Sequence, residues 1–541
     1  KATLRLNMTN HTTDTLVVDN NGNMLNLFGN ISGVSKLTWS VVDDSIASIS
    51  QVNAGDDTTY QVTARKRGVT TVIAKDSLTG RTAACRITVS DGFTNPALTM
   101  GKHHTVALKD DGTVWAWGDN ADGKVGVGSD QSMIPTPLQL EYFLDPDNGA
   151  EFSFENIVAI AAGGDHTLAL SEDGEVFAWG NNYYGQLGVD RTKMTFSAKP
   201  IRINTLSNIV AITAGSYHSM AMNGEGEVFV WGRNTSGQLG QGNYDTSNNS
   251  QNPKPVKVKG IGGGSTLKGA MTIAAAANTS AILMPNGSIL TFGDNARGEL
   301  GNGLSGEEMS RSTTIVTVKG VSDVVDIIGG GKNFVALTSN KEAYAWGGNQ
   351  SQQLGNADVA EDCSSTPVKV MTGWDTTLSN IRNVAIGGFD LTSSSAGDSR
   401  IINDVQMLAI TEDGKLYAWG SGANGKLGIG NTNNSTWAQQ VNFDKDQVIG
   451  VAAGGQHSGL IAENGDVYAW GTNAKGQLGN MDLSQRQLIP AKVGEDFINI
   501  KEGFNLTMRV GEVMQVHPEF LPFFNVKSKA SDVTFTFTSV Y

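Results

Sequence analysis

One stretch of thirteen residues, from Val176 to Gly188, recurs along the chain and constrains the fold more than any other feature. Its copies align on an aromatic residue followed by glycine, and an element similar to Gly-x-Leu-Gly follows each pair. The aligned pairs are Trp117-Gly118, Trp179-Gly180, Trp231-Gly232, Phe292-Gly293, Trp346-Gly347, Trp419-Gly420 and Trp470-Gly471. Their glycines are 62, 52, 61, 54, 73 and 51 residues apart. This repeat predicts an architecture built from copies of one small unit.

Each copy is predicted to contain a β-hairpin. Two short apolar runs flank a two-residue turn, which is Asp-Gly, Glu-Gly or Asn-Gly in all copies except Asn340-Lys341. Asp-Gly and Asn-Gly tolerate the positive φ of a tight hairpin. Further short strands bring each unit to about four strands. Because one such sheet cannot bury both of its faces, the units are predicted to stack as the blades of a propeller.

The motif around the second copy also carries a family resemblance. Residues 163–188 read Gly-Gly-x-His-Thr-x-Ala-Leu and then Asp-Gly-x-Val-x-x-Trp-Gly-x-Asn-x-x-Gly-Gln-Leu-Gly. This pattern closely resembles the repeat of the regulator of chromosome condensation family. The resemblance covers roughly residues 95–503 and implies a seven-bladed β-propeller.

The two ends of the chain are predicted to differ from the repeats. In residues 1–91, short alternating runs separated by Asn, Asp and Gly turns predict a β-sandwich. Residues 37–49 and 63–74 resemble a bacterial immunoglobulin-like domain, which implies a stalk module of a surface or secreted protein. Residues 504–541 resemble the start of a second, incomplete domain of this kind. The predicted fold class is all-β, with a seven-bladed β-propeller preceded by an immunoglobulin-like β-sandwich.

The first repeat lacks the strand pattern that precedes the hairpin in the other repeats, and our prediction of how the ring of blades closes depends on this. Its hairpin starts at Met100, which leaves no obvious strand before it. The runs at 489–493 and 497–500 repeat the pattern of the missing strands. We predict that these C-terminal strands complete the first blade, since closure removes open sheet edges. Because the chain starts at Lys1 and lacks an initial Met, we also expect that an upstream segment has been removed.

Charge and composition restrict the partners. The formal net charge of -14 argues against nucleic acid as a partner, because phosphate neutralisation requires clustered Lys and Arg. The sequence contains no run of 18 apolar residues, so no membrane insertion is predicted. Cys85 and Cys363 fall in different predicted domains and are expected to remain unpaired.

The residues that recur with the motif are interpreted as structural. Histidine occupies one aligned position in four copies, and Thr279, Asn333 and Gln406 occupy it in the others. The histidines are His104, His166, His218 and His457. A hydrogen bond within each blade explains this pattern better than catalysis or metal binding. The tryptophans are likewise interpreted as core between blades. We therefore predict no catalytic residue, cofactor or metal site.

The repeats differ in their insertions, at 129–155, 241–268, 356–379 and 389–404. Such loops emerge at the faces or rim of a propeller, where they carry binding. The predicted contact residues in or beside them are Tyr142, Phe143, Tyr183, Tyr244, Trp374, Asp390, Asp398, Asp404 and Trp437. The three carboxylates would be the catalytic candidates if a loop-built cleft had enzymatic activity instead.

Two classes of function compete. The first is a non-enzymatic adhesion or binding module, extracellular or on a bacterial cell surface, whose propeller loops bind a protein or a glycan. The second is an enzyme. The family resemblance also implies guanine-nucleotide exchange, photoreception and inhibition of a secreted β-lactamase. Of these three, only the inhibitor role is kept as an alternative, because exchange fits poorly beside bacterial stalk domains and photoreception would need exposed tryptophan clusters.

Overall fold

The computed structural model describes residues 3–8, 13–17, 37–52, 59–77, 80, 82–90, 92–359, 362–389, 404–480, 483 and 486–494. Regular structure in this part is β, apart from the short 3-10 turns η1 (Ala121–Gly123), η2 (Ile261–Gly263) and η3 (Ala423–Gly425). The described residues include no helix that is long and apolar enough to span a membrane. Among the described residues, neither the buried Cys85 nor the half-buried Cys363 belongs to a disulfide bond. Asp390, Asp398 and the segments 497–500 and 504–541, on which sequence predictions rest, lie outside the described residues.

The first seven strands form two sheets, with the orders β1-β7-β6-β3 and β2-β5-β4. The strands are β1 (Thr3–Asn7), β2 (Thr13–Val17), β3 (Leu37–Val41), β4 (Ala47–Gln51), β5 (Thr59–Ala64), β6 (Gly68–Asp76) and β7 (Thr82–Ser90). Val62 and Ile87 are fully buried in one cluster of these strands. Trp39 packs against this cluster, and its ring centre lies 4.4 Å from that of Tyr60.

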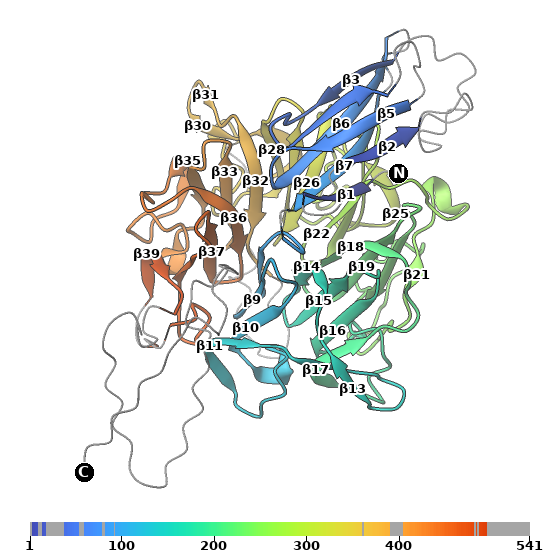
Figure 1. The fold of residues 1–541 in the computed structure, drawn as a ribbon, viewed down its shortest axis with the longest axis vertical. Helices are drawn as coiled ribbons and strands as arrows, with labels where there is room; N and C mark the ends of the chain where they lie inside the picture. Colours follow the sequence, from blue (N-terminus) through green and yellow to red (C-terminus); the bar gives the residue numbers. More distant parts are fainter. Residues whose placement is uncertain are drawn as a thin grey trace.

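Seven further sheets, here numbered 1 to 7, repeat one pattern of four antiparallel strands in chain order (Figure 1). Sheets 1 to 3 are β8 (Ala97–Met100), β9 (His104–Leu108), β10 (Val114–Asp119), β11 (Met133–Gln139); β14 (Ile157–Ala162), β15 (His166–Ser171), β16 (Val176–Asn181), β17 (Phe196–Arg202); and β18 (Ile209–Ala214), β19 (His218–Asn223), β20 (Val228–Gly232), β21 (Val256–Lys257). Sheets 4 and 5 are β22 (Thr272–Ala275), β23 (Thr279–Leu283), β24 (Ile289–Asp294), β25 (Arg311–Thr317); and β26 (Val324–Gly330), β27 (Asn333–Thr338), β28 (Ala343–Gly348), β29 (Cys363–Lys369). Sheets 6 and 7 are β32 (Ile381–Ile386), β33 (Gln406–Thr411), β34 (Leu416–Gly420), β35 (Ser435–Gln440); and β36 (Val448–Ala453), β37 (His457–Ala462), β38 (Val467–Gly471), β39 (Gln487–Lys492).

Two small hairpins are added to this pattern. The strands β12 (Tyr142–Leu144) and β13 (Glu151–Ser153) extend sheet 2, because Leu144 pairs with Ile201 of β17. The strands β30 (Met371–Gly373) and β31 (Thr376–Thr377) form a separate hairpin. Both hairpins arise from insertions identified in the sequence.

The turn between the second and third strands contains a left-handed residue in every one of the seven sheets. Gly174 takes this conformation in sheet 2, with φ of 79°. In sheet 5 the same position is Lys341, with φ of 61°. Asn340-Lys341 therefore keeps the turn geometry without glycine, at the steric cost that a side chain pays in this region.

The ring closes differently from the sequence prediction. Sheet 1 contains its own first strand, β8, and β39 pairs with β38 in sheet 7. Sheets 1 and 7 meet side by side, and the indole Nε1 of Trp117 donates to the backbone oxygen of Gln477 (3.0 Å). The prediction that residues 489–493 complete sheet 1 is wrong, because the four-residue strand Ala97–Met100 beside the linker was too short to recognise from the sequence.

The sheet of β1, β7, β6 and β3 lies against the side of the ring that carries the hairpin turns, here called the turn side. Arg86 of β7 pairs with Asp326 of β26, with 2.8 Å between Nη1 and Oδ1. Ala84 packs in one buried cluster with Met271 and Ile327. The opposite side, here called the loop side, carries the loops between third and fourth strands and those between first and second strands.

Candidate functional site

Buried hydrogen bonds join neighbouring sheets at the start of the second strands. The Nε2 atom of His166 lies 2.9 Å from the hydroxyl of Ser219 in the next sheet, and that hydroxyl donates to the backbone oxygen of Gln186 (2.9 Å). Because the hydroxyl proton is already used, the histidine donates through Nε2–H. Equivalent pairs are His104–Thr167 (3.0 Å), His218–Ser280 (3.0 Å) and His457–Thr105 (2.9 Å). The bonds cross between sheets, so the prediction of a bond within each blade is wrong.

Three interfaces lack the histidine. Between sheets 6 and 7, Gln406 takes its place and donates to the hydroxyl of Ser458 (3.3 Å). At the other two, between sheets 4 and 5 and between sheets 5 and 6, both partners change. The hydroxyl residue is replaced by Phe334 at one interface and by Met407 at the other. On the facing sheets stand Thr279 and Asn333, which instead donate to backbone oxygens of their own sheets (3.0 and 3.1 Å). Each of these buried polar side chains thus makes its hydrogen bond within its own sheet, since a buried polar group needs a hydrogen-bond partner.

The histidines are unsuited to acid–base chemistry. Burial lowers the pKa of His166 to about 4 and that of His218 to about 3. Gly215 lies against the ring of His218, and a Cβ at this glycine would lie 2.2 Å from Cε1. These rings are therefore neutral packing elements near pH 7.

We expect His218→Ala to lower the free energy of unfolding by about 1–3 kcal/mol, because it leaves a buried hydroxyl without its donor. Urea unfolding of His218→Ala, Ser280→Ala and the double variant measures the loss. The double variant should lose less than the sum of the single losses. Strictly additive losses would contradict a direct bond between the two side chains.

The aligned aromatic residues fill the space between sheets. Trp231 is fully buried, and its Nε1 donates to the backbone oxygen of Gln186 in the preceding sheet (2.8 Å). The other tryptophans make the same contact, as Trp117 to Gln477, Trp179 to Lys124, Trp346 to Glu299, Trp419 to Gln353 and Trp470 to Lys426. Phe292 is also fully buried but has no donor to offer. The interpretation of these residues as core between blades is confirmed.

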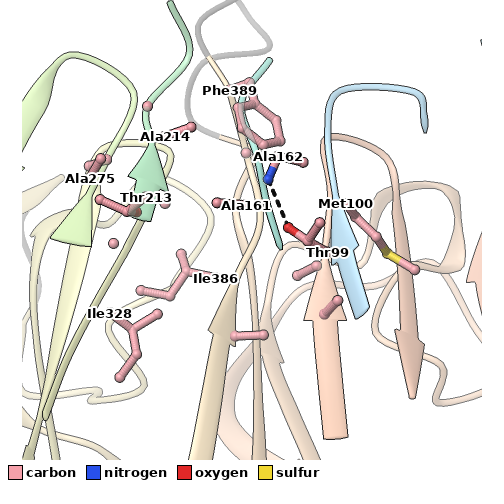
Figure 2. A pocket seen from close by; sticks show the side chains of 18 of the residues that line it. Thr99, Met100, Ala161, Ala162, Thr213, Ala214, Ala275, Ile328, Ile386 and Phe389 are labelled. Carbon is pink, nitrogen blue, oxygen red and sulfur yellow. Dashed lines mark hydrogen bonds between the residues drawn. The ribbon is translucent and has the colours of Figure 1, made fainter. Parts of the chain in front are cut away.

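A channel of about 260 Å³ lies between the first strands (Figure 2). Small and aliphatic side chains such as Ala161, Ile328 and Ile386 line it, and Phe389 lies at one end. Among the described residues, its lining includes no carboxylate, histidine or cysteine. In the described part of the chain, no three His, Cys, Asp or Glu side chains come together as a metal site. The polar side chains of this lining are the hydroxyls of Thr99, Thr213 and Ser216, and none of its described residues could act as their general base.

Tyrosines and arginines gather on the loop side of sheets 2 to 4. This Arg–Tyr surface presents Tyr183, Arg191, Tyr244 and Arg311, and the buried Tyr184, Tyr217 and Arg233 lie beneath it. The guanidinium carbon of Arg191 lies 4.8 Å from the ring centre of Tyr183, and that of Arg311 lies 4.5 Å from Tyr244. Arg191 also donates to the backbone oxygen of Tyr183 (2.8 Å), which fixes its position over the ring. Each exposed ring thus has a stacked cation and a preset orientation.

Insertion loops of neighbouring sheets support this surface. The hydroxyl of Tyr183, in sheet 2, donates to Asn249 of the sheet 3 insertion (2.6 Å). Arg191 donates to the backbone oxygen of the same Asn249. In that insertion Asn252 donates to Asp245, beside Tyr244 (2.9 Å). The loops therefore hold one another by side-chain hydrogen bonds, which preorganises the surface.

The surface continues inward to a buried charge cluster. Arg233 lies over the rings of Tyr184 (5.2 Å) and Tyr217 (5.7 Å), and the Tyr217 hydroxyl lies 3.4 Å from Asp165. Lys124 places its Nζ 2.7 Å from Asp165 and 2.9 Å from Asp119.

The buried lysine and its two carboxylates stabilise one another's charged forms. Burial opposes the ionised form of Asp165, but the Lys124 ammonium outweighs it and lowers the pKa of Asp165 to about 2. Burial likewise opposes the charge of Lys124, but Asp165 and Asp119 outweigh it and raise the lysine pKa. This cluster is a structural anchor beneath the surface.

The predicted contact residues separate into three places. Tyr183 and Tyr244, 44% and 47% exposed, lie on the Arg–Tyr surface. Tyr142, 49% exposed, lies on the β12–β13 hairpin. Trp374, 72% exposed, lies at the β30–β31 hairpin with its ring centre 5.3 Å from that of Trp437.

Two predicted residues are engaged inside the protein. Phe143 is only 8% exposed and packs edge-on against Phe177 with 4.7 Å between ring centres, so it belongs to the core and not to a contact surface. Asp404 pairs with the buried Lys426, with 3.0 Å between Oδ1 and Nζ. A carboxylate committed to a buried lysine is a structural partner, which argues against a catalytic role for Asp404.

The sequence analysis missed the arginines and two of the tyrosines on and beneath this surface. Tyr184 and Arg233 occupy variable positions within the repeated stretch, and Arg191, Tyr217 and Arg311 lie outside it. One available signal was Arg233, which follows Trp-Gly where the other copies carry Asp, Asn, Gly, Ser or Thr. Another was the tandem pair Tyr183-Tyr184.

Comparison with known families agrees with this architecture. Residues 35–391 match the RCC1-like domain, and residues 413–461 and 464–508 match the regulator of chromosome condensation (RCC1) repeat. The ultraviolet-B receptor UVR8 of Arabidopsis thaliana is 30% identical over 384 residues, which are 71% of this chain and 78% of that protein. The chain belongs to the RCC1-like domain family, and its fold is an all-β propeller of this type.

Further relatives share the domain within different proteins. The E3 ubiquitin-protein ligase HERC2 of Homo sapiens is 27% identical over 385 residues, which are 70% of this chain but only 7% of the ligase. Yeast RCC1 (Prp20), solved bound to Kap60, superposes with a TM-score of 0.58 at 22% identity, covering 71% of this chain and 84% of that one. Human WBSCR16 gives a TM-score of 0.57 at 21% identity, covering 70% and 94%. At these identities the solved structures show the fold alone.

Proposed function

We propose that this chain is a non-catalytic protein-binding module whose Arg–Tyr surface contacts the partner. In this proposal, sheets 1 to 7 are the seven blades of a propeller at residues 95–503, and residues 1–91 form an immunoglobulin-like sandwich packed on its turn side. The observation that carries the proposal is the pair of half-exposed tyrosines, Tyr183 and Tyr244, each stacked against an arginine. Tyrosine and arginine dominate the binding energy of protein interfaces because they bring large contact area at a low entropy cost.

The described relatives support a protein ligand. The solved structures of the yeast propeller are of RCC1 bound to Kap60 and of Prp20p in a study of its binding to Gsp1p and histones. Inhibition of a secreted enzyme would be one form of such binding. A glycan ligand, adhesion and an extracellular or bacterial-surface location remain predictions from the sequence, and the relatives named here come from a plant, a human and a yeast.

Replacing both Tyr183 and Tyr244 with alanine is expected to weaken binding to a protein partner by about tenfold or more, because each loss removes a stacked aromatic contact. Partners are captured with the full chain as bait, and each is then titrated against the wild type and the variants by calorimetry. Tyr142→Ala is the matched control, since it removes a tyrosine of similar exposure from the β12–β13 hairpin (residues 142–153), here called the rim hairpin. Equal affinity for the wild type and the double variant would contradict the proposal, as would an equal loss with Tyr142→Ala.

A further inference from the structure

The second residue of each Gly-x-Leu-Gly element occupies a buried slot between neighbouring sheets. Glutamine fills the slot in four sheets, as Gln186, Gln238, Gln353 and Gln477. Its Oε1 accepts the backbone N–H two residues earlier, as Gln238 does from Ser236 (2.8 Å). Its Nε2 donates to a side-chain oxygen in three of them: within the same sheet from Gln186 to Asn181 (3.0 Å) and from Gln353 to Asn333 (3.3 Å), and across the seam from Gln238 to Asn278 (3.2 Å). The amide thus serves as acceptor and donor at once.

In sheet 4 the slot holds Glu299, which is 1% exposed. Its Oε2 accepts the backbone N–H of Arg297 (2.7 Å), as the glutamine Oε1 does elsewhere. Its Oε1 therefore takes the place of the amide nitrogen, where it is buried and makes no hydrogen bond. The Nζ of Lys332 lies 3.8 Å from this oxygen and 3.4 Å from Asp294. An ionised Glu299 would thus share one ammonium with a second carboxylate.

We propose that Glu299 makes the seam between sheets 4 and 5 a pH-sensitive joint of the ring. A protonated carboxyl supplies the donor that the amide supplies in other sheets, whereas an ionised one leaves a buried acceptor and two neighbouring negative charges. The same seam lacks the histidine–hydroxyl pair, since Thr279 faces Phe334 there. When Glu299 is ionised, this seam therefore has neither the histidine–hydroxyl bond nor a donor in the glutamine slot. This inference does not depend on the proposed binding function.

The charges around Glu299 set the direction of the pH effect. Burial, followed by the carboxylate of Asp294 at the end of β24, raises the pKa of Glu299 to about 7 from an ordinary value of 4.5, against the opposing charge of Lys332 before β27. A carboxyl with a raised pKa in the folded state contributes stability that is complete below about pH 4.5. That contribution is lost as the pH rises through about 7. The seam is therefore tight in acid and loosens above neutral pH.

The test compares the wild type with Glu299→Gln, which installs the residue that four other sheets carry, between pH 5 and pH 8.5. The melting temperatures of the two proteins are expected to be similar at pH 5, and Glu299→Gln is expected to melt a few degrees higher at pH 8.5. Gln238→Glu is the matched control, because it places a carboxyl in the same slot at the seam between sheets 3 and 4. Its melting temperature, relative to the wild type, should fall by a similar amount as the pH rises from 5 to 8.5. If the melting temperatures of the wild type and Glu299→Gln changed with pH in the same way, the proposal would be overturned.

Hydrogen exchange gives a second, local readout. The backbone amides of Arg297 and Ser236 donate equivalent hydrogen bonds to the side chains of Glu299 and Gln238. Because both exchange faster at higher pH for the same chemical reason, the ratio of their exchange rates cancels that ordinary effect. In the wild type the Arg297 to Ser236 ratio is expected to rise severalfold between pH 6 and pH 8.5, and in Glu299→Gln it should stay constant. A constant ratio in the wild type would also overturn the proposal.

Discussion

Trp231→Ala is expected to lower the free energy of unfolding of the ring by about 3–5 kcal/mol, the range for removing a large aromatic side chain from a core. Trp231 is fully buried between sheets 2 and 3 and bonds the backbone oxygen of Gln186 (2.8 Å). That same oxygen accepts a hydrogen bond from the Ser219 hydroxyl, which in turn accepts one from the Nε2–H of His166. The substitution therefore removes core volume and one of the hydrogen bonds that join these two sheets.

Trp231→Phe is the matched variant for this prediction, because sheet 4 carries phenylalanine at the aligned position. It keeps most of the volume and loses the indole donor, so the expected loss is smaller, about 1–2 kcal/mol. Chemical unfolding followed by circular dichroism measures both losses. If Trp231→Ala unfolded at the same denaturant concentration as the wild type, the aromatic contacts could not be what holds neighbouring sheets together.

Lys124→Ala is expected to cost about 3–5 kcal/mol, because it leaves the carboxylates of Asp119 and Asp165 largely buried without their cation. The same unfolding experiment measures this loss. Sheet 3 provides the design of a rescue, since Gln238 and Asn278 occupy the equivalent positions there and bond across the seam (3.2 Å). Lys124→Gln combined with Asp165→Asn should therefore recover most of the stability that Lys124→Ala loses.

The rescue variant separates two explanations of the buried lysine. If charge pairing is the reason for the cost, the neutral pair restores stability, because it removes a buried carboxylate together with the lysine. If the double variant were as unstable as Lys124→Ala, the contribution of Lys124 would have to come from its aliphatic stem instead.

The repeated part of the fold could be predicted from the sequence, because the same local rules act in every copy. Turn chemistry, apolar spacing and the Trp-Gly pair recur in register, and they specified the hairpins and the buried tryptophans. The direction of the histidine bond was not predictable in this way, since His166 and Ser219 are 53 residues apart in the chain. Motif periodicity does not distinguish a partner in the same sheet from one in the next.

The candidate site was predicted only in part, for a related reason. Tyr183 and Tyr244 stood out as aromatic residues in or beside insertions, but their stacking partners depend on contacts between sheets. Arg311, for example, is 67 residues from Tyr244 in the sequence and lies 4.5 Å from its ring in the structure. Such pairs arise from the side-by-side packing of loops, and no periodic signal marks them. The prediction of how the ring closes was wrong because closure depends on β8, a strand of only four residues.

The measurement that tests the binding proposal most directly is hydrogen exchange of the full chain with and without a captured protein partner. Contact through the Arg–Tyr surface predicts slower exchange in residues 183–191, in residues 244–252 and around Arg311 when the partner is bound. The rim hairpin at 142–153 should exchange at the same rate in both samples. Protection confined to that hairpin or to the turn side, with residues 183–191 unchanged, would contradict the account.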